Sequence, residues 1–222
     1  MQRHCENMLA RRARRSGGGP DYLCFTALAD DSSVGMVKFN YSGDEYVEAP
    51  DVTLYTSADK VGWTPYVPGT TGGIQLAKAG DKVYWKGDND TLITWGVDGS
   101  GYCGFSMSGS IAASGDVASL LDSACATEAS CFAYLFRECA SLVAGPRLKH
   151  RTIQGLDYLN LFSGCSSISR IYVSLTEWPP EGTVNWVSGV PAGGEFHCPA
   201  ALDASTFDES HVPVGWTVVK DM

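Results

Sequence analysis

The sequence predicts a mixed fold, in which an N-terminal all-β sandwich precedes a short α/β solenoid of stacked repeats with an aromatic C-terminal cap. Residues 134–142 read Y-L-F-R-E-C-A-S-L and return as N-L-F-S-G-C-S-S-I at 160–168, a constant offset of 26 residues. A fixed period of this size is typical of stacked-repeat architectures. Residues 21–113 are instead a series of short β-prone segments. Charged residues make up only 18% of the chain and glycines number 25, which favours strands and turns over long surface helices.

Residues 1–20 are predicted to be a basic N-terminal arm with a Gly-rich linker. Five of the 16 basic residues lie in 1–15, and residues 16–20 read S-G-G-G-P, a flexible break. A basic arm on an acidic body is suited to docking, so we expect residues 1–19 to bind other proteins of an assembly. A tail without a role is the alternative. The segment has no apolar stretch of the kind found in secretory signals, so export by that route is not expected.

Residues 21–113 are predicted to form the sandwich, of an immunoglobulin-like kind. The expected strands are rich in β-branched and aromatic residues and lie at 22–28, 35–39, 52–56, 63–67, 73–76, 82–86 and 102–107. Turn residues separate them about every ten positions, which is typical of sandwiches and barrels. The run S-A-D-K-V-G-W at 57–63 is interpreted as a hairpin turn.

Residues 114–222 are predicted to form the repeat stack and its cap. Residues 131–139 lack Gly and Pro and suit a short helix, and 117–121 and 141–146 are expected as strand-like edges. The structural repeat residues expected to point inward are Leu135, Phe136, Cys139, Leu142, Leu161, Phe162, Cys165 and Ile168. The cysteines are expected to stay reduced in positions too tight for a larger side chain. The aromatic residues expected to cover the open end of the stack are Trp178, Trp186, Phe196, Phe207 and Trp216.

The repeats, the closing segments V-N-W-V-S-G-V-P (184–191) and P-V-G-W-T-V (213–218), and the preceding motifs F-T-A-L (25–28) and A-G-D-K-V-Y (79–84) together suggest a family. The chain resembles the BspA-type leucine-rich-repeat surface proteins of gut Bacteroidales and of their phages. The resemblance implies a leucine-rich-repeat stack and a non-enzymatic role in attachment or recognition. This chain has about two repeats where relatives often carry more, and it lacks a lipoprotein leader. The small number of repeats argues against a large concave ligand face, and the missing leader favours a virion protein over a bacterial surface lipoprotein.

Charge and composition exclude several classes of function. The net charge of -9 makes the molecule a poor nucleic-acid binder. No stretch approaches the roughly 20 apolar residues of a membrane span. The eight cysteines include no C-x-x-C pair, so we expect reduced structural cysteines rather than a disulfide framework or a zinc site.

One basic cluster stands out in the repeat region: Arg147, Lys149, His150 and Arg151. It is either a solvated turn or a contact for an anionic glycan or a partner. No histidine stands in a metal or nucleophile motif, and the acidic runs at 88–90 and 98–101 lack the full ligand series of a calcium loop. The sequence therefore predicts no catalytic, cofactor-binding or metal-binding residue, and no cofactor.

These observations predict a non-enzymatic binding or structural protein, a phage tail or fibre component that attaches to the bacterial cell surface. A bacterial cell-surface adhesin of the leucine-rich-repeat type is the alternative within binding. A glycan hydrolase is the alternative from another class, and it would need two carboxylates about 5–10 Å apart that no motif indicates. The expected partners are a host cell-surface glycan or protein, other virion or surface proteins, and further copies of the chain in a homo-oligomer.

Overall fold

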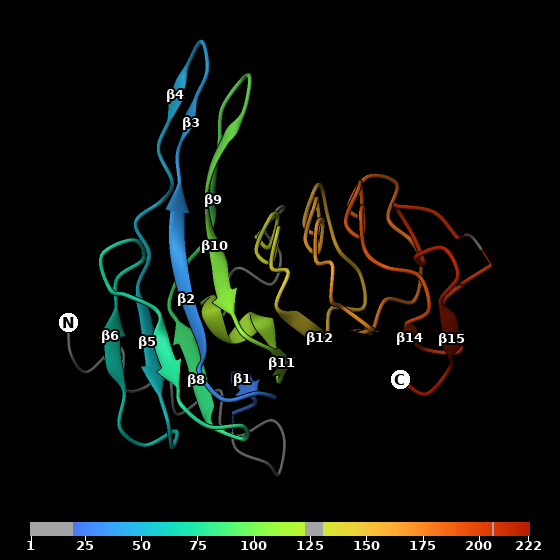
Figure 1. The fold of residues 1–222 in the computed structure, drawn as a ribbon. Coiled ribbons are helices and arrows are strands. Elements are labelled where there is room, and N and C mark those ends of the chain that lie inside the picture. The colour runs from blue at the N-terminus through green and yellow to red at the C-terminus, as the bar shows by residue number, and fades with distance from the viewer. Residues whose placement is uncertain (1–19, 123–130, 206) are drawn as a thin grey trace.

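Nine strands from both halves of the chain form one continuous sheet. In the computed structural model, which describes residues 20–122, 131–205 and 207–222, their order is β15-β14-β13-β12-β11-β1-β8-β5-β6 (Figure 1). The bounds are β1 (Leu23–Ala27), β5 (Leu54–Ser57), β6 (Thr64–Tyr66), β8 (Lys82–Gly87), β11 (Ile111–Ser114), β12 (Leu142–Leu148), β13 (Arg170–Val173), β14 (Glu195–His197) and β15 (Thr217–Val219). Pairing is antiparallel from β6 to β11 and parallel from β11 to β15.

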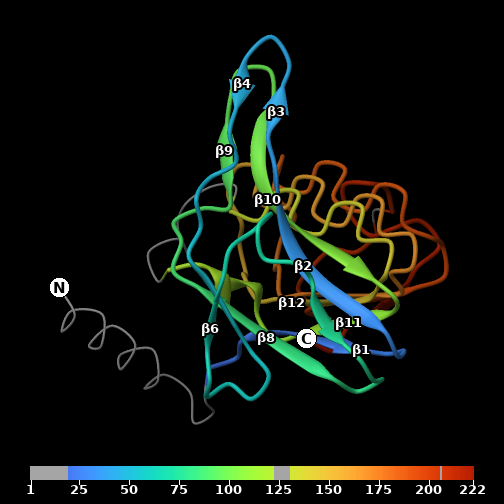
Figure 2. The same cartoon turned by 60° about the vertical axis from the view of Figure 1, so that its left-hand side comes forward.

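A second sheet lies against the antiparallel part of the first and makes a sandwich with it (Figure 2). Its order is β7-β2-β10-β9, with bounds β2 (Ser32–Phe39), β7 (Ile74–Leu76), β9 (Ile93–Trp95) and β10 (Ser100–Ser108). A separate hairpin pairs β3 (Tyr41–Ser42) with β4 (Tyr46–Val47). The buried rings of Phe25 and Trp85 lie edge-on to that of Phe105, at centroid distances of 4.8 and 5.2 Å.

Both sheets of the sandwich bond to the repeat region. On one side β11 pairs with β12 in parallel. On the other side the backbone N–H of Phe105, in β10, donates to the carbonyl of Leu135 at 2.8 Å. The buried hydrophobic residues of the two halves also belong to one cluster. The sandwich therefore acts as the first layer of the stack and covers one end of its core.

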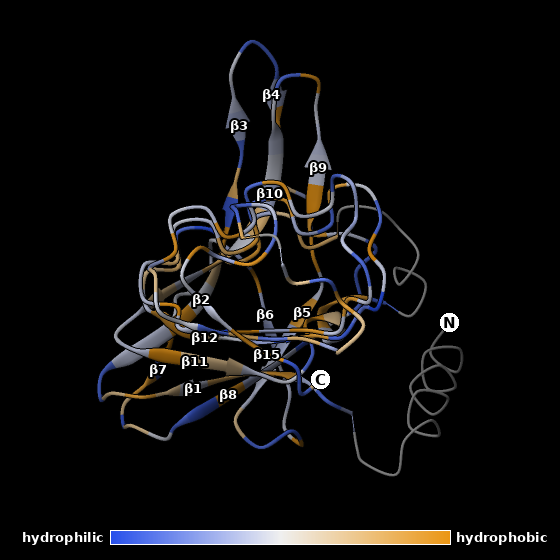
Figure 3. Ribbon diagram, turned by 90° about the vertical axis from the view of Figure 1, so that its right-hand side faces the viewer, coloured by the Kyte–Doolittle hydropathy of each residue, from blue (hydrophilic) through white to orange (hydrophobic). Residues whose placement is uncertain are grey.

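The stack itself consists of similar coils laid on one another, each contributing one parallel strand. Viewed along the stack, the coils follow nearly the same outline (Figure 3). Register partners on the strand face are 26 residues apart at Ala144↔Arg170 and 25 apart after the register shift in β12, as in Arg147↔Tyr172 and Tyr172↔His197. The 26-residue offset seen in the sequence also relates the first two coils on the opposite face, where Phe136 and Phe162 stack at 5.5 Å.

The face opposite the strands is built from turns that bond to the next coil. Within a coil, the N–H groups of Leu135, Arg137 and Cys139 donate to the carbonyls three residues earlier. The intervening N–H groups of Tyr134, Phe136 and Glu138 donate instead to the next coil, at Leu159, Leu161 and Ser163. The next coil repeats the pattern onto the one after it, from Tyr158, Asn160, Phe162 and Gly164 to Gly182, Val184, Trp186 and Ser188. Every second N–H group of this segment therefore bonds within its own coil, and the others bond to the next coil. None of these N–H groups remains to form the hydrogen bonds of an α-helix.

The predicted α/β class is therefore wrong, because the described residues form strands, turns and one 3-10 helix but no α-helix. The expected helix at 131–139 is a run of turns. A helix is about 10–12 Å across, whereas hydrogen-bonded chains lie about 4.8 Å apart, so helices on one face would splay these coils. The strand-like edge expected at 117–121 is also wrong. Residues Val117–Leu120 form the 3-10 helix η1, and the Asp116 carboxylate accepts from the N–H of Ala118 at its start.

Left-handed residues shape each coil at two equivalent places. The third residue of the turn 132–135 is Tyr134, with φ 63°, and that of the turn 136–139 is Glu138, with φ 60°. A positive φ at this position is what a type II turn requires, and Gly and Asn adopt it most readily. The later coils have those residue types at the equivalent positions: Asn160, Gly164, Asn185 and Gly189.

The structural repeat residues of the sequence lie inside the stack. All eight are at most 2% exposed. Both cysteine thiols are free, and each donates to a carbonyl of the preceding layer: Cys139 to Phe105 at 3.2 Å and Cys165 to Phe136 at 3.0 Å. Burial raises the pKa of Cys139 to about 12, which keeps this thiol protonated at neutral pH.

The aromatic residues of the predicted cap differ in burial. Trp186, Phe196 and Trp216 are buried and Trp178 is half-buried, whereas Phe207 is 45% exposed. The indole N–H of Trp186 donates to His211 and that of Trp216 to Pro191, in each case 25 residues away. These bonds tie the last coils together. No helix among the described residues has the length and apolar character needed to cross a membrane.

Candidate functional site

The outer surface of the parallel strands carries a row of polar side chains. Arg147, Tyr172 and His197 are register partners on β12, β13 and β14. The guanidinium carbon of Arg147 lies 5.8 Å from the centroid of Tyr172, whose ring stacks on His197 at 4.5 Å. Parallel pairing repeats every outward position about 4.8 Å further along, which brings these three residues into contact across 50 positions of sequence.

A pocket of about 470 Å³ lies beside this row, and we call it the basic pocket. Its lining residues are Arg147, Lys149, Arg151, Tyr172, Ser174, Asp221 and Met222. The three cations come from alternate positions of β12 and of the extended chain after it, and all are exposed. Alternation along a strand sends every second side chain to the same face, which explains why they converge.

The cations of the basic pocket are only partly neutralised. Lys149 pairs with Asp21, and both side chains are about half exposed, so the pair contributes little to stability. The carboxylate of Asp221 accepts from Nδ1 of His197 at 3.0 Å. Within the part of the chain that the structure describes, neither Arg147 nor Arg151 has a carboxylate partner. The pocket therefore offers two guanidinium groups to an anionic ligand.

His150 does not join the predicted cluster. It lies on the inner side of the same segment, with its ring 5.7 Å from that of Phe132. Near it is the buried carboxyl of Asp157, which accepts from the N–H of Cys131 at 2.8 Å. Burial raises the pKa of Asp157 to about 6, while the neighbouring His150 and two backbone N–H groups act in the opposite direction. The predicted cluster therefore divides in two. Arg147, Lys149 and Arg151 lie on the outer surface, whereas His150 lies on the inner side, near Asp157.

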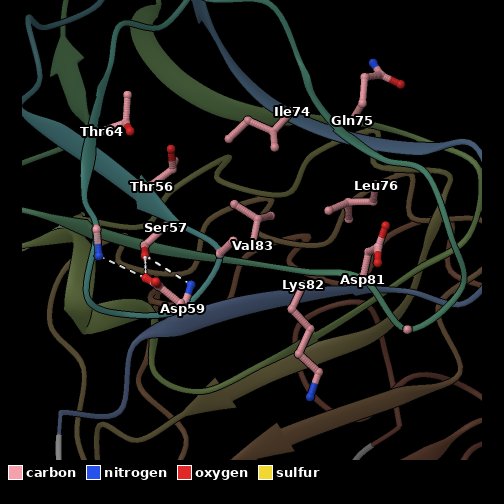
Figure 4. Close-up of a pocket in the computed structure, with 13 residues that line it drawn as sticks. Thr56, Ser57, Asp59, Thr64, Ile74, Gln75, Leu76, Asp81, Lys82 and Val83 are labelled. Atoms are coloured by element: carbon pink, nitrogen blue, oxygen red, sulfur yellow. Dashed lines mark hydrogen bonds between the residues drawn. The ribbon is translucent and has the colours of Figure 1, made fainter.

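A larger cavity, of about 720 Å³, lies in the sandwich between the turn after β5 and the strands β7 and β8 (Figure 4). Its floor is apolar, with Ile74, Leu76 and Val83. The carboxylate of Asp59 on its rim accepts from Ser57 and from two backbone N–H groups of the turn. These bonds lower the pKa of Asp59. Because the carboxylate is used to stabilise the hairpin turn, we assign Asp59 a structural role and no role in ligand binding.

The described residues offer no alternative metal-based site. In residues 20–122, 131–205 and 207–222, no group of three or more His, Cys, Asp or Glu side chains is placed to hold a metal ion. Asn89, in one of the acidic runs, instead bonds both backbone groups of Thr53 and the carbonyl of Leu120.

Sequence reasoning found the three cations of the basic pocket but missed Tyr172, Ser174, Asp221 and His197. The signal that identifies two of them is the 25-residue register of the strand face, which connects Arg147 to Tyr172 and Tyr172 to His197. The 26-residue offset of the first two coils would pair Arg147 with Val173 instead, because the register shifts by one residue between Ala144 and Arg147.

No family model, curated protein or solved structure matches this chain. The resemblance to the leucine-rich-repeat proteins thus remains an expectation from the sequence. The function has to be argued from the chemistry of the basic pocket.

Proposed function

We propose that this protein is a non-enzymatic attachment protein, a component of a phage tail or fibre, which binds an anionic glycan of the bacterial cell surface in the basic pocket. The observation that carries the proposal is the convergence of Arg147, Lys149 and Arg151 on one pocket. The virion location is supported by the resemblance and by the basic arm of the sequence. The arm itself, residues 1–19, lies outside the described residues.

The chemistry of the pocket supports an anionic ligand. A guanidinium group binds carboxylate or phosphate through two parallel hydrogen bonds, a geometry that a lysine cannot reproduce. Tyr172 adds an aromatic ring from β13, and Ser174 adds a hydroxyl group directly after that strand. A pocket of about 470 Å³ falls in the range that small ligands occupy. Acidic sugar residues combine the required charge with hydroxyl groups and an apolar face.

The contrast with the rest of the molecule adds to the argument. The chain has a net charge of -9, so a general electrostatic attraction to anions is absent. A positive pocket on an acidic protein acts only at short range, within roughly 8–10 Å at physiological salt. Such an arrangement favours a specific anionic group over an extended polyanion.

Binding is better supported than hydrolysis. Asp221 is the one acidic side chain among the lining residues, and it already contacts His197. A hydrolase of the usual kind requires a second carboxyl group across the bond that is cleaved. The proposal therefore assigns the pocket no chemical step.

Binding of the full chain to immobilised acidic and neutral polysaccharides from bacterial surfaces tests the proposal. We expect binding to an acidic polysaccharide that falls at least about tenfold when Arg147 and Arg151 are changed to Ala, the loss expected for charged hydrogen bonds. Arg137→Ala is the matched control, because Arg137 also lies 5.8 Å from a tyrosine ring, that of Tyr134, but on the turn face. Equal losses in both variants, or release of new reducing ends from the polysaccharide, would contradict the proposal.

The virion location needs a separate measurement. Mass spectrometry of purified phage particles should detect the chain at a fixed ratio to known tail proteins. Its presence only in the membrane fraction of uninfected bacteria would support the adhesin alternative instead.

A further inference from the structure

Two hairpins project side by side from one end of the sandwich (Figures 1 and 2). One is formed by β3 and β4, and the other by β9 and the first residues of β10. We call their ends, residues 40–48 and 93–101, the paddle. It lies apart from the basic pocket, which is on the strand face of the stack.

Close packing makes the paddle one preformed surface. The ring of Tyr41 lies over Gly99, where a Cβ atom would come 2.4 Å from the ring. The N–H of Val97 donates to the carboxylate of Glu45 at 3.3 Å, so each hairpin holds the other. Glycine at 99 is required by this close approach, since any side chain would separate the two hairpins.

The paddle exposes apolar side chains that do not pack into the core. Val97 is 90% exposed, Tyr46 63% and Trp95 43%. Single exposed apolar residues are ordinary, but three on one projecting end form a surface suited to contact with another molecule. Trp and Tyr are also the residue types most often found at the centres of protein interfaces.

The charges around these side chains select a cationic partner. Four carboxylates lie on the paddle, at Asp44, Glu45, Glu48 and Asp98, and all are exposed. Neither residues 39–59 nor residues 87–101 contain a lysine or arginine. This surface would repel the anionic ligand of the basic pocket, so the two surfaces have different partners.

We propose that the paddle of one copy binds the arginine-rich segment 1–15 of another copy. That segment contains Arg3, Arg11, Arg12, Arg14 and Arg15 and only one acidic residue, Glu6. Guanidinium groups stack on the faces of Trp and Tyr rings and bind carboxylates, so the composition of the segment complements that of the paddle.

The position of the segment's attachment favours exchange between copies. Residues 20–22 lead into β1, at the base of the sandwich, whereas the paddle projects from its other end (Figure 1). With residues 1–15 bound, only residues 16–19 remain as a bridge, and four extended residues span at most about 13–14 Å. The bound paddle therefore belongs to a neighbouring copy whose paddle lies beside the base of this sandwich. Repeated exchange of this kind would join copies head to tail, in keeping with a fibre component.

Sedimentation velocity of the full chain over a concentration series tests the proposal. We expect self-association at about 50 mM salt that weakens strongly at about 500 mM, because screening shortens the reach of the charges. Val97→Lys should weaken association at least about tenfold by repelling the arginines. The matched control is Val61→Lys, since Val61 is 82% exposed on the turn after β5, away from the paddle. A synthetic peptide of residues 1–15 should compete with association of the full chain.

Three outcomes would overturn the proposal. The first is a chain that stays monomeric over the whole series at low salt, as binding within one copy would produce. The second is an equal effect of Val97→Lys and Val61→Lys, which would place the contact elsewhere. The third is association that the peptide does not reduce, which would exclude segment 1–15 as the occupant.

Discussion

The sandwich and the stack share one sheet and one core, yet they satisfy their backbones in different ways. In the sandwich, antiparallel neighbours such as β1 and β8 exchange hydrogen bonds between strands that differ in sequence. In the stack, each coil bonds to a near copy of itself on both faces. The strands of the sandwich therefore select their partners through their own differing sequences. The coils of the stack instead pair with a neighbouring coil of similar sequence, beginning at the edge of the sandwich. The difference teaches that a stack of few coils is stable when another fold covers its end.

The largest expected effect tests whether the two regions unfold together. Phe162 and Phe25 are both fully buried, one in the stack and one in the sandwich. Replacing either with Ala should lower the free energy of unfolding by about 3–5 kcal/mol, as usual for large-to-small changes in packed cores. Hydrogen exchange by mass spectrometry should show both regions losing protection equally in each variant. Loss confined to the stack in Phe162→Ala would show two independent units.

The second prediction sharpens the comparison through charge. Acidic groups in the sandwich, such as Asp59, are exposed and have a lowered pKa because hydrogen bonds stabilise the carboxylate. In the stack, Asp157 has its pKa raised to about 6 by burial. Folding thus disfavours the Asp157 carboxylate. This cost is fully present above about pH 6 and is relieved as the pH falls from there toward the unfolded value of 3.8.

Asp157→Asn should accordingly stabilise the protein by about 1–3 kcal/mol at pH 8, with the gain disappearing near pH 4. Asparagine keeps an oxygen that accepts from the N–H of Cys131. Asp59→Asn is the control of opposite sign, since its lowered pKa gives stability above the unfolded pKa that is lost as the pH falls. Urea unfolding at several pH values measures both. A destabilised Asp157→Asn at pH 8 would show that His150 more than offsets the cost of burial.

The comparison of the sandwich with the stack also explains which parts of the fold can be predicted from the sequence. The inward side chains of the coils were identifiable because Phe136 and Phe162 occupy equivalent positions and recur together with their neighbours. The helix at 131–139 was not excluded by its sequence, because a segment without Gly or Pro has no local reason to form turns. The competing bonds come from the next coil, which supplies carbonyl acceptors to alternate N–H groups. Tertiary contacts thus override local preference here.

The candidate site shows the same limit. Three of its cations are close in sequence and can be predicted together, but the same closeness places His150 in the predicted cluster although strand alternation turns it inward. Tyr172 and Ser174 lie on another coil, and only the parallel register of β12 and β13 brings them to the pocket. The register shift between Ala144 and Arg147 changes the offset from 26 to 25 residues within one strand, so a single offset misses such neighbours.

The smallest expected effect concerns the left-handed turn positions that distinguish the stack. Glu138 has φ 60° where the later coils have glycine, at Gly164 and Gly189. A residue with a side chain is strained there by about 1–2 kcal/mol, whereas glycine is not. Glycine also costs about 0.5–1 kcal/mol through the entropy of the unfolded chain, so the net gain in stability from Glu138→Gly should be about 0–1.5 kcal/mol. Gly189→Ala should lower the stability by a similar amount. Its Cβ would meet no atom closer than 3.7 Å, so the loss comes from the strain of a side chain at a positive φ.

A control one residue away separates this effect from a general response to glycine. Arg137 is in the same run of turns but has no positive φ. Arg137→Gly should therefore lose about 0.5–1 kcal/mol, the entropic cost without relief of strain. Thermal unfolding of the three variants measures the order directly. If Glu138→Gly and Arg137→Gly lose equal stability, the left-handed position in the first coil is not strained, and the equivalence of its turns with those of the later coils fails.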